Sequence, residues 1–97
     1  MLNLNQKNKY GNNALTALCF NSTSDKIVQV AKLLITKGVN IDHEDGEGSN
    51  ALIMLCRHST NEKIVQVVEL LIKRGIDIDQ RDKAGLNAAD YLSTRNV

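Results

Sequence analysis

Apolar residues recur along the chain at helical spacing, in segments separated by polar stretches rich in Asn, Asp and Gly. Leu15, Leu18 and Cys19 lie at i, i+3 and i+4, which places one apolar stripe on a short helix. Asn13 directly precedes this stretch, and an asparagine there can accept a hydrogen bond from an unpaired N–H of the first turn. The pattern therefore predicts a short helix that begins after Asn13.

A longer apolar segment follows the polar stretch NSTS and predicts a second helix from about residue 23 to residue 37. Ser22 and Asp25 have capping-box spacing, and Gly38 is expected to end the helix in a left-handed conformation. We expect neighbours on more than one side of this helix, because its apolar residues cover much of its circumference. These residues are Ile27, Val28, Val30, Ala31, Leu33, Leu34 and Ile35.

The same pattern occurs twice. KIVQV begins at residue 26 and again at residue 63, and a shift of 37 positions lays residues 11–42 over residues 48–79 with 19 of 32 pairs identical. The copy predicts a second short helix, a second long helix from about residue 60 to residue 74, and a further turn. Its key residues are Asn50, Leu52, Leu55, Cys56, Ser59, Glu62 and Gly75. GLNAADYL, which starts at Gly85 and includes Asn87, repeats the beginning once more.

These copies divide a single domain into repeated units. The divisions are the tail of a preceding unit (1–8), two full units (9–45 and 46–82) and the head of another (83–97). Each unit consists of helix, turn, helix and hairpin-like loop, and neighbouring units should bury each other's apolar faces. Ile41 and Ile78 are expected to anchor the loops to the core. Because the chain starts within a unit, we expect either a piece of a longer array or a protein that begins mid-unit.

This pattern resembles the ankyrin repeat family over nearly the whole chain. The family's G-x-T-P-L-H-x-A-A start is similar to GNNALTALC (11–19) and GSNALIMLC (48–56), and its V-x-x-L-L-x-x-G segment resembles VAKLLITKG from Val30. The resemblance implies an all-α fold, a short α-solenoid of stacked helix-turn-helix repeats with hairpin-like loops. The period of 37 exceeds the family's period of about 33. We place the four extra residues between the two helices.

Some residues depart from the family pattern. Thr16, Ile53 and Asp90 occupy the position of the family's histidine, while Asn and Ala replace its Thr and Pro. The hydrogen bonding between Thr and His that is usual in the family is therefore not expected here.

Composition excludes several classes of protein. The chain is 42% hydrophobic and 24% charged, as in soluble globular domains, and its net charge is +1. With so little net charge and only three aromatic residues, we expect no nucleic-acid partner. No apolar run is long enough for a bilayer and the start MLNLNQKN lacks a signal-peptide core, so we expect no membrane contact. The presence of only two cysteines favours a reducing compartment and predicts an intracellular, cytoplasmic protein.

The reactive residue types form no catalytic or metal-binding pattern. Cys19 and Cys56 are expected to be buried thiols, because stacked helices lie about 8–10 Å apart while a disulfide needs Cα atoms within roughly 7 Å. GEGSNA matches a dinucleotide motif only in its letters, since no strand precedes it. In DHEDGEG, Ile41 occupies the place of the first calcium ligand. His43 and His58 lack a partner at metal-binding spacing, so we expect no enzyme, no metal and no cofactor.

Comparison of the copies indicates which positions face solvent. Phe20 corresponds to Arg57, and Tyr10 corresponds to Glu47. A position that holds a charge in a near-identical copy is not expected to be deeply buried, because an unpaired buried charge is costly. We therefore expect Phe20 and Tyr10 to be exposed aromatics of the kind enriched at protein interfaces. The alternative is that Phe20 packs locally on the next unit.

The resemblance also implies that loop tips and the ends of the first helices line a concave face that binds another protein. By position, the partner-binding residues are Lys9, Tyr10, Asn12, Phe20, Asn21, Glu47, Ser49, Arg57, His58, Lys83, Ala84 and Leu86. The tips alternate in charge, from Lys9 through Glu44, Asp45 and Glu47 to Arg81 and Lys83. Such a stripe would fix the register of a partner, although ordinary solvated loops would have the same composition.

We therefore predict a non-enzymatic protein–protein interaction module with an unidentified protein partner. One alternative is a self-associating repeat unit, a homo-oligomer formed through uncapped ends, because the helix at residues 60–74 would expose apolar surface. The other alternative is a structural fragment of a larger ankyrin scaffold.

Overall fold

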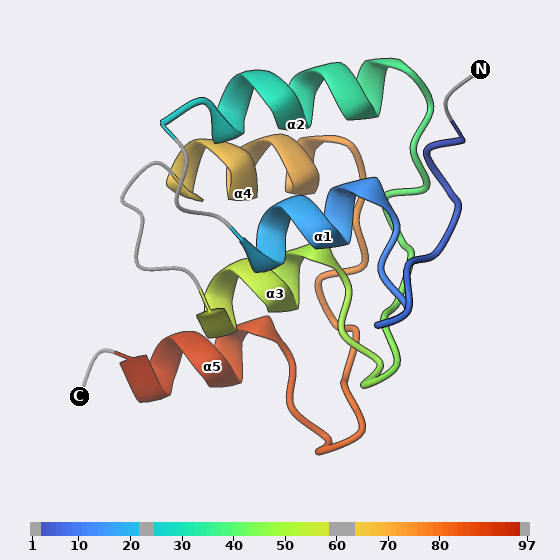
Figure 1. Ribbon diagram of the computed structural model, residues 1–97. Helices are drawn as coiled ribbons and strands as arrows, with labels where there is room; N and C mark the ends of the chain where they lie inside the picture. Colours follow the sequence, from blue (N-terminus) through green and yellow to red (C-terminus); the bar gives the residue numbers. More distant parts are fainter. Residues whose placement is uncertain (1–2, 22–24, 59–63, 96–97) are drawn as a thin grey trace.

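The computed structural model describes residues 3–21, 25–58 and 64–95. They form α1 (Ala14–Phe20), α2 (Ile27–Thr36), α3 (Ala51–His58), α4 (Ile64–Lys73) and α5 (Ala88–Arg95). The first helices α1, α3 and α5 lie in one row, and α2 and α4 form a second row beside it (Figure 1). The described residues contain no strand. The predicted all-α stack of helical repeats is confirmed.

The first helix of the second unit forms the centre of the core. Every residue from Ala51 to Cys56 is buried, because α1 and α5 cover two sides of α3 and α4 packs against a third. In the second row, Ile27 and Ala31 of α2 and Val67 and Leu71 of α4 are fully buried where the two helices meet. Complete burial of an aliphatic side chain of this size contributes about 1.5–3 kcal/mol, so these contacts between units dominate the stability of the stack.

Equivalent residues differ in exposure where their neighbours differ. Val67 is fully buried against α2, whereas its equivalent Val30 is 37% exposed because no described helix covers that side of α2. Ile41 packs against the core as predicted. Ile78 is 54% exposed, so its predicted anchoring is wrong. The segment that follows Ile78 supplies only α5 among the described helices and no second helix to cover this side chain.

An asparagine caps the first helix of each unit, as predicted. The backbone N–H groups of Thr16, Ile53 and Asp90 donate to Oδ1 of Asn13, Asn50 and Asn87 at 3.0, 3.0 and 2.9 Å. Thr16 Oγ1 and Asp90 Oδ2 each accept a hydrogen bond from the N–H of the capping residue at 3.0 Å. Ile53 has no polar atom for this role, so the positions of the family's histidine serve helix capping in two of the three units.

The same asparagine amides also hold the connecting segments in place. Nδ2 of Asn13 donates to the carbonyl oxygen of Asn40 at 3.1 Å, and Nδ2 of Asn50 donates to the carbonyl oxygen of Asp77 at 3.0 Å. Both asparagines are only 1% exposed. Each amide therefore supplies an acceptor to the helix and a donor to the chain that leaves the unit, whereas an ionised aspartate could supply only the acceptor.

The second helix starts later than its sequence pattern predicted. Asp25 and Lys26 lie in a turn and α2 begins at Ile27, so the prediction of a continuous helix from residue 23 is wrong. The polar residues of this stretch favour a turn over a helix start. Ser22, Ser59 and Glu62, and with them both predicted capping boxes, lie outside the described residues.

The ends of both second helices are confirmed. Gly38 and Gly75 have φ angles of 93° and 88°, the left-handed conformation that glycine adopts without strain. The N–H of Val39 donates to the carbonyl of Leu34, and the N–H of Ile76 donates to that of Leu71, at 3.1 Å each. Val39 and Ile76 are buried, so each of these Schellman turns also closes on the core.

The double role of the buried amide predicts a specific cost for Asn50→Asp. The variant keeps the capping oxygen but loses the donor to Asp77 and buries a carboxylate, so the free energy of unfolding should fall by about 2–3 kcal/mol in a urea titration. Asn87→Asp is the matched control, because Asn87 caps α5 while its Nδ2 bonds no described residue. The control should change stability by less than about 1 kcal/mol, and equal losses in both variants would contradict this role.

Candidate partner-binding site

The three loop tips are built by one residue position that recurs at the repeat spacing. Asn8, Asp45 and Asp82 each accept two backbone hydrogen bonds on Oδ1, from the residues two and four positions later. All six distances lie between 2.9 and 3.1 Å. This role of Asn8, Asp45 and Asp82 was not predicted from the sequence. The signal was available, because all three copies carry Asn or Asp at this position and both residues favour such turns.

The tips are also fixed against one another. The N–H of Lys83 donates to the carbonyl of Glu47 at 2.9 Å, which joins the second and third tips. Nε2 of His43 donates to the carbonyl of Gly11 at 2.7 Å, and Gln80, its equivalent, donates to the carbonyl of Gly48 at 3.3 Å. These bonds connect each tip to the following loop, so the tips form a preformed surface on one side of the stack (Figure 1).

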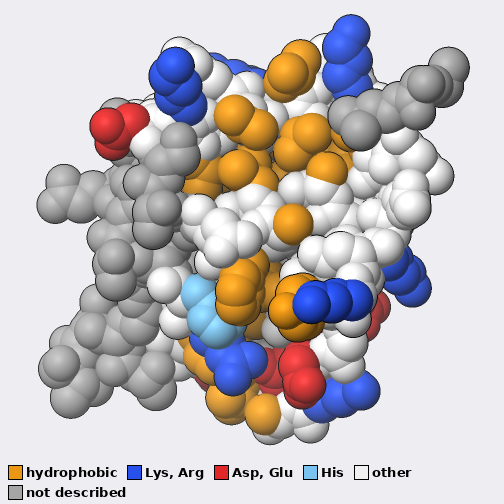
Figure 2. All heavy atoms as spheres, viewed as in Figure 1, with side chains coloured by type: hydrophobic (Ala, Val, Ile, Leu, Met, Phe, Trp, Pro, Cys, Tyr) orange, Lys and Arg blue, Asp and Glu red, His pale blue; other side chains and the backbone are white. Residues whose placement is uncertain are grey.

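A hollow of about 580 Å³ lies between the first two tips and the first helices α1 and α3. Its lining includes five of the residues predicted to bind a partner, namely Tyr10, Asn12, Phe20, Asn21 and Glu47. Met54 of α3 also lines the hollow and is almost completely buried, so it forms part of the floor. Figure 2 shows apolar side chains gathered on this face next to charged side chains of both signs.

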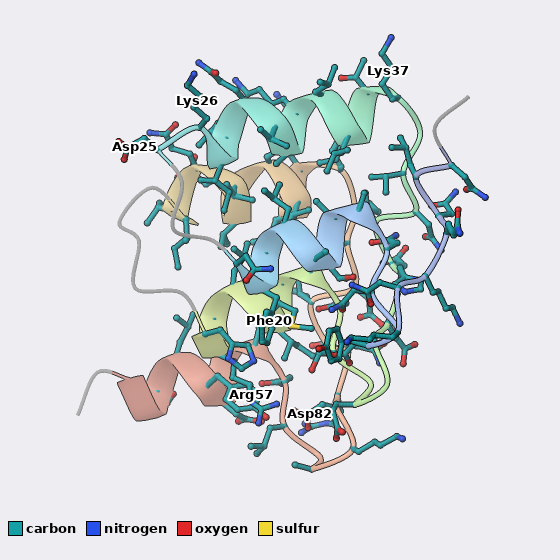
Figure 3. All side chains as sticks on the ribbon, in the orientation of Figure 1. Phe20, Asp25, Lys26, Lys37, Arg57 and Asp82 are labelled. Atoms are coloured by element: carbon teal, nitrogen blue, oxygen red, sulfur yellow. The ribbon has the colours of Figure 1, made fainter. Side chains whose placement is uncertain are left out.

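The two aromatic residues of the hollow are exposed, as predicted. Tyr10 is 67% exposed and Phe20 is 48% exposed. The Phe20 ring also packs on the next unit, with its centroid 4.9 Å from that of His58, so both interpretations of Phe20 hold (Figure 3). Nζ of Lys9 lies 5.2 Å from the centroid of the Tyr10 ring. The predicted residues Lys9, Tyr10, Phe20 and His58 thus lie in two close pairs at the hollow.

Two predicted site residues are buried. Asn12 is 7% exposed and its equivalent Ser49 is 1% exposed. Asn12 Oδ1 and Ser49 Oγ form no hydrogen bond with the residues that the structure describes, which costs about 1–3 kcal/mol for each buried atom. Leu86, at the third equivalent position, is 37% exposed. Only Asn12 lines the hollow, whereas Ser49 lies beneath the surface of its tip.

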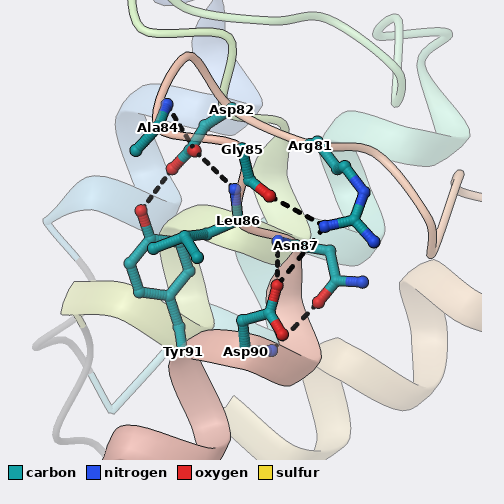
Figure 4. A network of polar contacts seen from close by, with 8 residues as sticks. All are labelled: Arg81, Asp82, Ala84, Gly85, Leu86, Asn87, Asp90 and Tyr91. Atoms are coloured by element: carbon teal, nitrogen blue, oxygen red, sulfur yellow. Dashed lines mark hydrogen bonds and ion pairs between the residues drawn. The ribbon is translucent and has the colours of Figure 1, made fainter.

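The boundary between the second and third units carries a different set of side chains. The guanidinium carbon of Arg57 lies 5.4 Å from the centroid of the Tyr91 ring, and the Tyr91 hydroxyl donates a hydrogen bond to Oδ2 of Asp82 (Figure 4). Burial alone would raise the pKa of Asp82. The hydrogen bonds from Tyr91, Leu86 and Ala84 and the charge of Arg57 outweigh burial and lower the pKa of this carboxyl.

The remaining predicted residues lie around these two places. Asn21 is exposed at the end of α1, and its Nδ2 donates to the carbonyl of Ala17 at 3.2 Å. Lys83 and Ala84 are exposed at the third tip, away from the hollow. Arg81 forms an ion pair with Asp90 at 3.6 Å, so part of the basic charge at this end of the stripe is neutralised within the chain.

Burial governs the chemical state of two described thiol and imidazole groups, those of Cys19 and His58. Burial raises the pKa of the Cys19 thiol to about 12, which keeps it protonated and unreactive. Cys56 is buried as well, and no disulfide joins the two cysteines. Burial and the neighbouring charge of Arg57 lower the pKa of His58, while Asp45 acts in the opposite direction. His58 is therefore neutral at pH 7.

Within residues 3–21, 25–58 and 64–95, no three His, Cys, Asp or Glu side chains converge as a metal-binding group. In the same part of the chain, the longest helices fall well short of the apolar length that a bilayer requires.

Comparison with known proteins identifies the family of the chain. A family model described as ankyrin repeats (3 copies) matches residues 1–82. The matched range contains α1 to α4 and ends before α5. A search of curated proteins found no match.

The hydrogen bond between Tyr91 and Asp82 predicts a pH-dependent contribution to stability. Tyr91→Phe should lower the free energy of unfolding at pH 7 by about 1.5 kcal/mol, the low end for a bond to a charged group, because the pair is partly exposed. The pKa of Asp82 is lowered from its ordinary value of 3.8 in the folded state. The bond's contribution is therefore present above pH 3.8 and lost as the pH falls through the lower folded pKa.

Urea titrations of wild type and Tyr91→Phe from about pH 2 to well above pH 10 measure this effect. The difference between the two proteins should shrink below about pH 4. The pKa of Tyr91 is raised, first by its bond to Asp82 and then by burial, so the difference should also shrink well above pH 10. A difference that is constant across the acid range would contradict the assignment.

Proposed function

Because the chain belongs to the ankyrin repeat family, whose members generally act as protein–protein interaction modules, we propose that it binds a partner protein through its concave face. The loop tips and first helices form this face. The hollow walled by the exposed rings of Tyr10 and Phe20 is the observation that carries the proposal. The face acts as a preformed surface and performs no chemistry.

The shape and composition of the hollow support this function. Aromatic side chains are enriched in the buried centres of protein interfaces, and here two exposed aromatic rings line the same recess. The hydrogen bonds within and between the tips hold the backbone in one conformation before a partner arrives. A preformed surface loses less conformational entropy on binding, which favours affinity.

We propose different roles for the predicted residues. Tyr10 and Phe20 are the central anchors, with Lys9, Asn21, Glu47, Arg57 and His58 around them and Lys83, Ala84 and Leu86 extending the contact along the third tip. Asn12 acts from the wall of the hollow. Ser49 supports its tip from below and does not touch the partner, because it is 1% exposed.

We also propose that the protein is not an enzyme and that it works in the reducing cytoplasm. The two cysteines are buried and no disulfide joins them, and the raised pKa of Cys19 removes it as a nucleophile. Disulfides form and persist in oxidising compartments, and buried cysteines that form no disulfide are compatible with a reducing one.

Substitution of the two anchors tests the proposed face. A partner captured on the immobilised protein is purified and titrated against wild type and Tyr10→Ala/Phe20→Ala. The double variant should bind at least about tenfold more weakly, because interface anchors often contribute more than 1 kcal/mol each. Its melting temperature should stay within about 3 °C of wild type, since surface substitutions usually change stability by less than 0.5 kcal/mol.

Leu92→Ala serves as the control for loss of exposed apolar surface. Leu92 is 42% exposed on α5, away from the hollow, and its removal should leave binding unchanged. Equal affinity of the double variant and wild type would contradict the proposed face. A large loss of stability in Phe20→Ala would show instead that this ring belongs to the core.

Self-association is the second candidate function, and the outer face of α4 favours it. Val65 and Ile72 are 59% and 50% exposed. Their equivalents on α2, Val28 and Ile35, are partly buried against the core where α4 packs on α2. The exposed face of α4 is equivalent to the face of α2 that α4 covers. A second copy of the chain that packed on α4 would therefore bury this apolar face in the same way.

Light scattering at two protein concentrations distinguishes the monomer from a self-associated form. For this candidate the mean mass should rise with concentration, and Val65→Lys/Ile72→Lys should abolish the rise because it places charges in the contact. A mass that stays monomeric at both concentrations would eliminate self-association.

A further inference from the structure

We infer that the hollow between the first two loop tips binds an arginine side chain of the partner protein. The carboxylates of Asp45 and Glu47 would receive the guanidinium group, and the rings of Tyr10 and Phe20 would hold its aliphatic stem. This inference rests on the proposed function and specifies the chemistry of the partner.

The chain itself provides a precedent at the next boundary between units. A shift of 37 positions takes Phe20 to Arg57, Met54 to Tyr91 and Asp45 to Asp82. At that second boundary the guanidinium of Arg57 lies over the Tyr91 ring at 5.4 Å, and its charge contributes to the lowered pKa of Asp82. Figure 3 shows Arg57 on the same face as Phe20, towards Asp82. The first boundary keeps the carboxylate, has Met54 in the place of the Tyr91 ring and Phe20 in the place of the arginine, and no Lys or Arg lines it.

The charges that line the hollow are complementary to an arginine. Asp45 and Glu47 line it, and no Lys or Arg does. The Glu47 carboxylate forms no ion pair or hydrogen bond with the residues that the structure describes. Gly46 stands where the other tips carry Lys9 and Lys83, so no basic side chain projects from this position towards the two carboxylates. Nζ of Lys9 lies 5.2 Å from the centroid of the Tyr10 ring, so an incoming cation meets two carboxylates in the lining and one basic side chain beside Tyr10.

A guanidinium group suits a recess that holds more than one acceptor. It carries five N–H donors, and it can satisfy acceptors on more than one side of a recess, such as the two carboxylates that line this hollow.

Arginine suits the hollow better than lysine. Its planar group can lie against an aromatic ring and donate to a carboxylate at the same time, which a compact ammonium group does less well. The intramolecular precedent is also an arginine over a ring. We therefore expect arginine peptides to bind more tightly than lysine peptides of the same sequence.

Selection of peptides tests the inference without knowledge of the natural partner. Random peptides displayed on phage are selected on the immobilised full chain, and enriched sequences are synthesised with arginine or with citrulline, which has the same shape but no charge. Enriched peptides should share an arginine, and citrulline should weaken binding about tenfold in fluorescence anisotropy, as expected for loss of a charge pair and a cation–π contact.

Matched variants of the protein locate the effect. Asp45→Asn/Glu47→Gln removes both carboxylates. The amide introduced in place of Asp45 keeps the acceptor that Asn8 supplies in the first tip, so the fold should be retained, as checked by circular dichroism. This variant should weaken the arginine peptide about tenfold and leave the citrulline peptide unchanged. Glu44→Gln removes a charge from the same loop outside the hollow and should have no effect.

The outcomes separate this inference from the proposed function. Peptides that lose binding with Phe20→Ala but not with citrulline would overturn the arginine assignment and leave the binding face intact. Peptides that are unaffected by Phe20→Ala and by the charge variants would overturn both. A selection that enriches no arginine-bearing peptide would also overturn the arginine assignment.

Discussion

A single buried amide at the start of the first helix fixes the geometry of each full unit. The Asn13 and Asn50 side chains use their oxygen to cap the helix and their nitrogen to hold the chain that leaves the unit. The angle between helix and connecting segment is therefore set by one rigid group. The loop tips begin where these segments end, so the position of each tip relative to its helix follows from the same bond pattern.

The sequence predicted those features that depend on local pattern. The apolar spacing, the asparagine caps, the terminal glycines and the repeat indicated the helices and their order, and comparison of Phe20 with Arg57 indicated the exposure of Phe20. The burial of a side chain by the adjacent unit was harder to predict from the sequence. Ile41 and Ile78 occupy equivalent positions in the two copies, yet only Ile41 packs against the core. Among the described helices, α3 and α4 follow the segment of Ile41, whereas α5 alone follows the segment of Ile78.

The candidate site illustrates the same limit more sharply. Comparison of equivalent positions in the repeats was enough to place Tyr10, Phe20 and Glu47 on one face. The same comparison could not show that Ser49, which also belongs to a loop tip, is buried. The contact between Arg57 and Tyr91 joins residues from two units, and nothing local to either residue specifies it. The acceptor role of the Asn or Asp in each tip was visible in the repeat, and it was missed because apolar spacing carries no information about loop turns.

Near-identical scaffolds at the two boundaries carry different chemistry. The turns, caps and hydrogen bonds between loops recur in both units, while a few outward positions vary. Phe20 of the first unit, for example, corresponds to Arg57 of the second. Fold and recognition are thus encoded by separate sets of residues, so outward positions can change without disturbing the bonds that hold the stack.

The recurrence of the bonds between loops has a consequence for how such a protein can grow. His43 and Gln80 make corresponding contacts with the glycines that precede their own units' first helices, and both full units end in the same kind of turn. A duplicated copy of one complete unit would meet, at each junction, partners that the scaffold already accommodates. In-frame gene duplication can therefore lengthen the array by one unit at a time. Each added unit extends the exposed face, and substitutions of its outward residues can produce a new binding specificity.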